Sequence, residues 1–137
     1  MEEYKQQIKG IDYFEKVVKI SLTKKEWMSS ITWCELMEIR GCERLSKEWF
    51  EDLNWLVMYP ISKEIHLPNK VYQPDINIAF DIPRELLRMF VYSIGKIAYD
   101  LDAKGITSVI AQNILEKINK QLKEQLSSED KWFKDGF

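Results

Sequence analysis

The sequence predicts a mainly α-helical protein: a single-domain helical bundle of about five helices over residues 1–137, with one irregular or strand-like segment near 61–82. Apolar residues recur at helical spacing through most of the chain. All four prolines fall between positions 60 and 83, on or near the limits of the one stretch that breaks this spacing. With 137 residues, 45% of them apolar, the chain is long enough to bury one core without disulfides or metals.

The N-terminal part of the chain predicts two helices. The first runs from about Glu3 to Ile20, because apolar side chains three and four positions apart share one face while charged residues share the other. The second opens at Thr23, which is expected to form a capping box with Glu26, since each side chain can accept a hydrogen bond from the other residue's backbone N–H. It ends at Gly41, because glycine readily adopts the left-handed conformation that closes many helices.

A third helix is predicted after Ser46, a favourable N-cap residue. It must stop near Pro60, because proline has no N–H to donate and its ring collides with the preceding turn. Beyond it, apolar and polar residues alternate from Ile76 to Ile82, which is the period of a strand. One strand cannot form a sheet alone. Three arrangements are open: it pairs with residues 70–72, lies extended across the helices, or completes the sheet of a partner.

Two further helices are predicted toward the C-terminus. The fourth begins with Pro83 in its first turn and ends before Gly105, and its apolar residues from Leu86 to Leu101 fill one continuous arc. The fifth starts after Thr107. Because the connection is short, these two helices are expected to pack as an antiparallel hairpin. A C-terminal tail follows, held against the bundle by the aromatic residues Trp132, Phe133 and Phe137.

Composition and motifs argue against several functional classes. The net charge of −2 lacks the basic excess of a general nucleic-acid binder. No apolar run approaches the roughly 18–20 residues that cross a bilayer, and the N-terminus lacks a signal peptide, so a cytoplasmic protein is expected. Cys34 and Cys42 are interpreted as reduced thiols. His66 is the only histidine, no nucleophile motif surrounds any serine, and the glycines are isolated, so no catalytic residues and no cofactor are assigned.

The best-ordered polar feature is an acidic stripe on the third predicted helix. Glu48, Glu51, Asp52 and Trp55 fall within about 100° of arc at helical spacing, opposite the apolar residues of the same helix. The stripe is therefore expected to face outward. One interpretation is an ordinary solvated face with one incidental aromatic residue. The other is a partner-binding surface, because tryptophan is common at binding hot spots and carboxylates around it suit a basic protein.

The second predicted helix adds Glu35 and Glu38, near a face that also carries apolar residues. Carboxylates in such a setting are paired with cations or bind a hard metal ion such as Mg²⁺. The pattern Glu35-x-x-Glu38 followed by Glu51 and Asp52 resembles the paired ExxE and ExxD motifs of the all-α nucleoside triphosphate pyrophosphatases, the MazG and dimeric dUTPase group. The likeness covers about twenty residues, and Asn54 stands where that family has an aspartate. It implies a Mg²⁺-dependent enzyme using Glu35, Glu38, Glu48, Glu51 and Asp52.

These observations favour a non-enzymatic protein-interaction domain, in its most concrete form a small inhibitor or immunity-type protein that binds a basic protein partner. Glu48, Glu51, Asp52 and Trp55 are its predicted contact residues, and neither a nucleic acid nor a membrane is an expected partner. The pyrophosphatase-like enzyme is the alternative. A third class, self-association into a homo-oligomer, is also open, because helical hairpins often form subunit interfaces.

Overall fold

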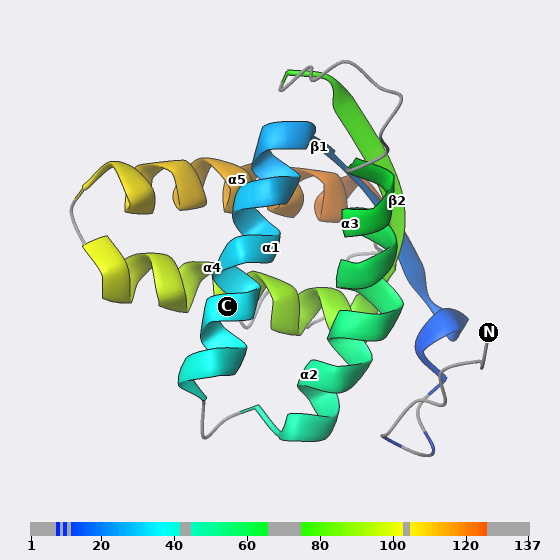
Figure 1. The fold of residues 1–137 in the computed structure, drawn as a ribbon. Coiled ribbons are helices and arrows are strands. Elements are labelled where there is room, and N and C mark those ends of the chain that lie inside the picture. Colours follow the sequence, from blue (N-terminus) through cyan, green and yellow to red (C-terminus); the bar gives the residue numbers. More distant parts are fainter. Residues whose placement is uncertain are drawn as a thin grey trace.

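The computed structural model describes residues 8, 10, 12–41, 45–65, 75–102 and 105–125. This part of the chain is mostly helical, with four helices and a small two-stranded antiparallel sheet (Figure 1). In chain order, the elements are η1 (Tyr13–Glu15), β1 (Val17–Thr23), α1 (Lys24–Arg40), α2 (Lys47–Leu53), η2 (Asn54–Met58), α3 (Tyr59–Ile65), β2 (Asn77–Pro83), α4 (Arg84–Asp102) and α5 (Ile106–Gln125). The elements α2, η2 and α3 follow one another without a break and form one of the four helices.

The sheet replaces the first predicted helix, and the prediction of five helices is wrong in this respect. Residues 13–20 form a short 3₁₀ turn and most of β1, while residues 3–7, 9 and 11 lie outside the described part. β1 pairs antiparallel with β2, with Val18 opposite Ile82 and Leu22 opposite Ile78. The strand predicted near 76–82 is therefore confirmed. Its partner is β1, and residues 70–72, the partner considered from the sequence, lie outside the described residues.

Helix α1 begins and ends as the sequence predicts. The Thr23 hydroxyl accepts a hydrogen bond from Glu26 N at 3.1 Å, and Glu26 Oε1 accepts one from Thr23 N at 2.9 Å. At the other end, Gly41 has a φ of 79°, and its N–H donates to the Met37 carbonyl. Both ends depend on contacts between neighbouring residues, which explains why they could be read from the local sequence.

The helix after Ser46 was predicted to stop near Pro60, and this prediction is wrong. The helix continues to Ile65. The turn before the proline is a π-helical segment, η2, in which Tyr59 N donates to the Asn54 carbonyl five residues back. A π turn is wider than an α turn by one residue. Proline has no N–H to place in the helical ladder, and the wider turn relieves the collision between its ring and the preceding carbonyl, so the helix passes through Pro60.

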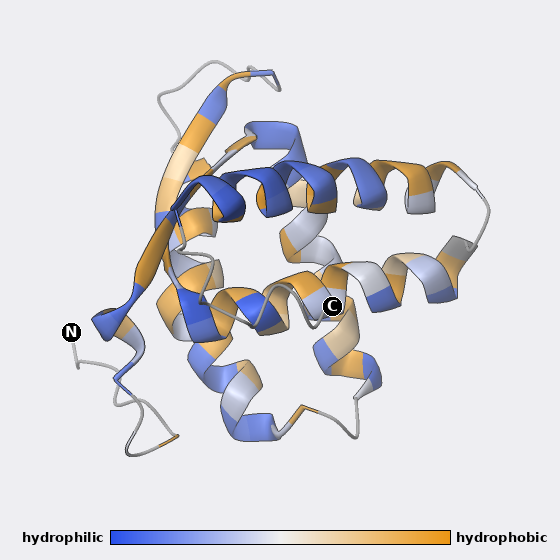
Figure 2. Cartoon of the chain, turned by 180° about the vertical axis from the view of Figure 1, so that it is seen from behind, coloured by the Kyte–Doolittle hydropathy of each residue, from blue (hydrophilic) through white to orange (hydrophobic). Residues whose placement is uncertain are grey.

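The hairpin of α4 and α5 forms one wall of the core. The apolar arc of α4 is buried from Leu86 to Ala98, whereas Leu101 is 55% exposed. α5 contributes buried Ala111, Ile114, Ile118 and Leu122, and orange apolar faces of both helices turn toward the interior (Figure 2). Leu126 and the tail aromatics Trp132, Phe133 and Phe137 lie outside the described residues.

The two-stranded sheet is attached to the helices through one of its faces. Val18, Ile20 and Leu22 of β1 are buried, and Trp27 of α1 packs against Phe80 of β2 with ring centroids 5.3 Å apart. Trp27 Nε1 also donates to the Ile78 carbonyl at 2.8 Å. Because this indole is fully buried, its N–H needs that acceptor. The contact fixes the sheet relative to α1.

The outer edge of β1 is closed by side chains of α5, which runs beside it (Figure 1). Gln121 accepts a hydrogen bond from Ser21 N at 2.7 Å and donates to Ser21 O at 2.9 Å. Gln125 makes the same pair of bonds with Lys19, at 2.8 Å and 2.7 Å. Each side-chain amide thus takes the place that a neighbouring strand's backbone would occupy. We call Gln121 and Gln125 the glutamine clamp.

Candidate functional site

The predicted stripe on α2 and η2 is partly exposed, and an unpredicted tyrosine extends it. Glu48 is exposed, Glu51 is partly buried, and Trp55 is 45% exposed. Trp55 packs against Tyr59, which is also 45% exposed, with ring centroids 5.5 Å apart. The sequence prediction did not include Tyr59, although it lies within the helix expected between Ser46 and Pro60. The i, i+4 spacing of the two rings was the available signal.

Asp52 does not lie on the outward face, so the prediction of a four-residue exposed stripe is corrected here. Its side chain is fully buried and accepts hydrogen bonds from the Tyr13 hydroxyl at 2.8 Å and from Ile8 N at 3.2 Å. Tyr13 is itself buried, with its ring edge against Trp49. The segment before β1 therefore covers the Asp52 side of α2. A helical projection of one segment cannot show that another segment covers part of it.

The Glu51 side of α2 faces carboxylates of α1. Partial burial raises the pKa of Glu38, and the nearby negative charges of Glu35 and Glu51 raise it further. Carboxylates of α1 and α2 thus lie within range of mutual repulsion. Among the described residues, Glu35, Glu38, Glu48 and Glu51 form no ion pair or hydrogen bond through their side chains. We call the set Glu35, Glu38, Glu48, Glu51, Trp55 and Tyr59 the acidic–aromatic face.

The carboxylates do not form the metal site that the pyrophosphatase resemblance implies. In the ranges that the structure describes, no group of three or more His, Cys, Asp or Glu side chains is placed to hold a metal ion. The carboxylate of Asp52, one of the five residues in the implied set, is bound instead to Tyr13 and Ile8. As the structure places them, these five side chains do not converge in the way that the resemblance implies.

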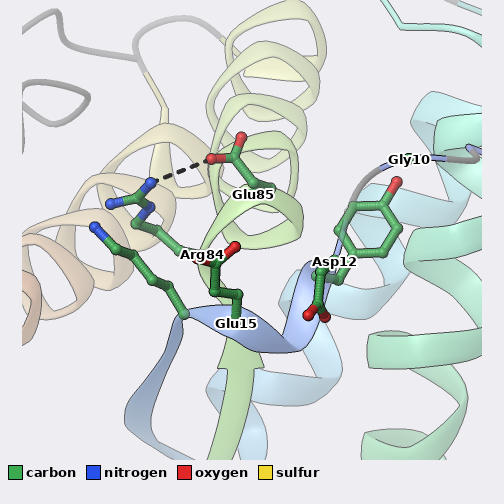
Figure 3. A pocket seen from close by; sticks show the side chains of 7 residues that line it. Gly10, Asp12, Glu15, Arg84 and Glu85 are labelled. Atoms are coloured by element: carbon green, nitrogen blue, oxygen red, sulfur yellow. Dashed lines mark hydrogen bonds and ion pairs between the residues drawn. The ribbon is translucent and has the colours of Figure 1, made fainter.

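A second feature is a surface hollow of about 420 Å³ where η1 meets the start of α4. Figure 3 shows residues that line it, among them Gly10, Asp12, Glu15, Arg84 and Glu85. Arg84 forms an ion pair with Glu85 at 3.4 Å, and its backbone N–H donates to the Lys16 carbonyl. The lining carries charges of both signs, so the hollow favours neither an anion nor a cation. The pairing of β1 with β2 brings these distant residues together.

Cys34 is a buried residue of the core rather than part of an exposed site. It is a free thiol, fully buried in the core, with its Sγ 3.8 Å from the Phe90 carbonyl oxygen. Burial, and then the negative charge of Glu35, raises the pKa of the thiol. The neutral thiol is therefore favoured, and it is the thiolate that reacts. Cys42 and His66 lie outside the described residues.

Comparison with known proteins adds no family to these observations. No protein-family model, no curated protein and no solved structure matches the chain. Among the described helices, none is long and apolar enough to cross a membrane.

Proposed function

We propose that the protein is a non-enzymatic protein-interaction domain, an inhibitor or immunity-type protein, that binds a basic protein partner through the acidic–aromatic face. One observation carries the proposal: two half-exposed aromatic rings, tilted against each other with centroids 5.5 Å apart, continue a helix face whose carboxylates form no ion pair with a cation among the described residues. Asp52 is not part of this surface, because its carboxylate is buried against Tyr13.

The charge arrangement favours a cationic partner. Partial burial and then the nearby charges of Glu35 and Glu51 raise the pKa of Glu38, so a positive charge brought to this place would relieve repulsion among the three carboxylates. A lysine or arginine of a partner therefore gains more here than at an isolated carboxylate. Clustered carboxylates also attract a basic protein at a distance and speed its association, an effect that weakens as salt is added.

The aromatic pair supplies the apolar anchor that charges alone do not provide. Trp55 and Tyr59 have large rings with few rotatable bonds, and such residues dominate the energetics of many interfaces. An arginine side chain can stack on the face of either ring while it pairs with a neighbouring carboxylate. Truncation of a hot-spot tryptophan costs about 2 kcal/mol or more, which is roughly 30-fold in Kd.

The test starts with affinity capture from the native cell, using the wild-type protein and three variants, followed by calorimetry with the partner that is identified. Trp55→Ala and Glu51→Lys change the proposed surface. Tyr99→Ala is the matched control, because Tyr99 is an aromatic residue of α4 that is 65% exposed and lies outside that surface. Circular dichroism confirms that each variant is folded.

The expected result is a basic protein that wild type and Tyr99→Ala retain and that Trp55→Ala and Glu51→Lys lose. Its affinity should fall as the salt concentration rises. If the identified partner binds Trp55→Ala with wild-type affinity, the proposed surface is wrong.

A further inference from the structure

The two edges of the sheet differ. Lys24 N donates to Ile76 O at 2.9 Å and Arg84 N to Lys16 O at 3.0 Å, so the even-numbered residues of both strands carry the hydrogen bonds between them. The odd-numbered residues point their N–H and C=O groups away from the partner strand. On β1, the glutamine clamp binds these groups at Lys19 and Ser21.

On β2, the corresponding groups belong to Asn77, Ala79 and Asp81, all of them exposed. No hydrogen bond from the described ranges reaches them. An open strand edge is a template for another strand. This edge is short, because the next outward position is Pro83, which has no N–H.

We propose that β2 pairs antiparallel with β2 of a second copy of this chain, centred on Ala79, to form a symmetric dimer with a continuous four-stranded sheet. In this register Ala79 lies opposite Ala79 of the second copy, and Asn77 lies opposite Asp81 of the second copy. Each of these pairs exchanges two N–H···O hydrogen bonds. The surface is self-complementary, as a two-fold interface requires.

Charge selects this register over its neighbours. A shift of the centre toward the start of β2 places Asp75 opposite Asp81 of the second copy, and a shift toward its end places Asp81 opposite itself or Asn77 opposite Pro83. Like charges directly opposite each other are destabilising, and proline removes a donor. With Ala79 at the centre, the Asn77 amide can donate to the Asp81 carboxylate across the interface.

The side chains on the helix-facing side of the strand agree with the same register. Ile78 and Phe80 are only partly buried, and Ile76 is 47% exposed. The pairing brings Ile78 opposite Phe80 of the second copy, an aromatic and β-branched pair that stabilises antiparallel strands. The interface shares no residue with the acidic–aromatic face, so the dimer and the proposed function can be tested independently.

Two substitutions at one exposed position test the register by sedimentation equilibrium. Asn77→Asp places carboxylates opposite each other twice in the dimer and should weaken it roughly fivefold. Asn77→Lys creates two ion pairs with Asp81 and should strengthen it roughly fivefold. Circular dichroism and the urea midpoint show that both variants keep the monomer fold.

Cross-linking gives the geometric check. In a Cys42→Ser background, Ala79→Cys places two thiols on facing Cα atoms about 5.5 Å apart, which suits a disulfide. Lys19→Cys is the control, because it is an exposed position on the clamped edge. The proposal predicts a cross-linked dimer for the first variant and none for the second. It is overturned if the wild-type chain stays monomeric up to about 1 mM, or if a dimer forms that neither responds to Asn77 nor cross-links through Ala79→Cys.

Discussion

The glutamine clamp makes a specific prediction about stability, tested by Gln121→Glu. This substitution keeps the shape of the side chain and the oxygen that accepts from Ser21 N at 2.7 Å. It removes the amide N–H groups that donate to Ser21 O at 2.9 Å and to Lys117 O at 3.2 Å. At neutral pH an ionised carboxylate then faces two carbonyl oxygens without a proton between them.

The magnitude follows from the loss of a donor at a partly buried carbonyl. An unsatisfied group of this kind costs about 1–3 kcal/mol, and partial access to water places the expected loss near 1–2 kcal/mol. The same change at Gln125 should cost less, about 0.5 kcal/mol, because its contacts with Lys19 are exposed and water can replace the lost donor. A larger loss of unfolding free energy for Gln121→Glu than for Gln125→Glu is the stricter test, because it does not depend on either absolute value.

The loss should also depend on pH. A protonated carboxyl can donate to Ser21 O, so the fold favours the neutral form and raises the pKa of the introduced group above its unfolded value. Stability is therefore regained as the pH falls toward and below about 4.3. Urea unfolding of wild type, Gln121→Glu and Gln125→Glu at pH 7 and pH 4.5 measures these differences. Equal losses at the two positions, or a Gln121→Glu defect that grows as the pH falls, would refute the account.

Two further substitutions test contacts that fix the fold. Tyr13→Phe removes the buried hydroxyl that donates to Asp52 and should lower the free energy of unfolding by about 1–3 kcal/mol, whereas Tyr59→Phe, at an exposed hydroxyl, should change it little. For Glu26, burial works to raise the pKa, but hydrogen bonds from Lys117 and Thr23 and the charge of Lys117 lower it overall from 4.5. Its contribution is therefore present above pH 4.5 and lost as the pH falls through the lowered folded-state pKa, so Glu26→Gln should destabilise the protein by about 0.5–1 kcal/mol at pH 7 and by less in acid. Urea titrations across pH 3–7 measure both effects, and a Glu26→Gln loss that persists unchanged in acid would contradict the second.

Local signals predicted the parts of the fold that depend on neighbouring residues. The capping box at Thr23, the end of α1 at Gly41 and the start of α2 after Ser46 each involve residues within four positions of one another. The apolar arc of α4 was also predicted from local sequence, because apolar residues at helical spacing mark the face of a helix that is buried.

The errors arose where distant residues decide the structure. Residues 17–23 alternate in the period of a strand, but part of the same apolar set also fits a helix face. Pairing with β2, some sixty residues away, selects the strand. On the predicted stripe, Glu48 and Trp55 are exposed as expected, whereas Asp52 is buried because the segment at Tyr13 covers it. The π turn before Pro60 was not predicted, and Tyr59 was missed although it stands four residues after Trp55.

The glutamine clamp also shows how a helix can imitate a strand over a short distance. Four residues of helix rise about 6 Å, and two residues of strand advance about 6.7 Å, so side chains one helical turn apart meet alternate strand residues almost in step. α5 runs against β1 in this way, with Gln121 at Ser21 and Gln125 at Lys19. One turn earlier stands Lys117, which binds Glu26, whose carboxylate already holds Thr23 N. The mismatch of about 0.7 Å per turn accumulates, and such a ladder can extend for only a few steps. In this protein, two glutamines spaced by four on α5 are enough to close the outer edge of β1 at Lys19 and Ser21.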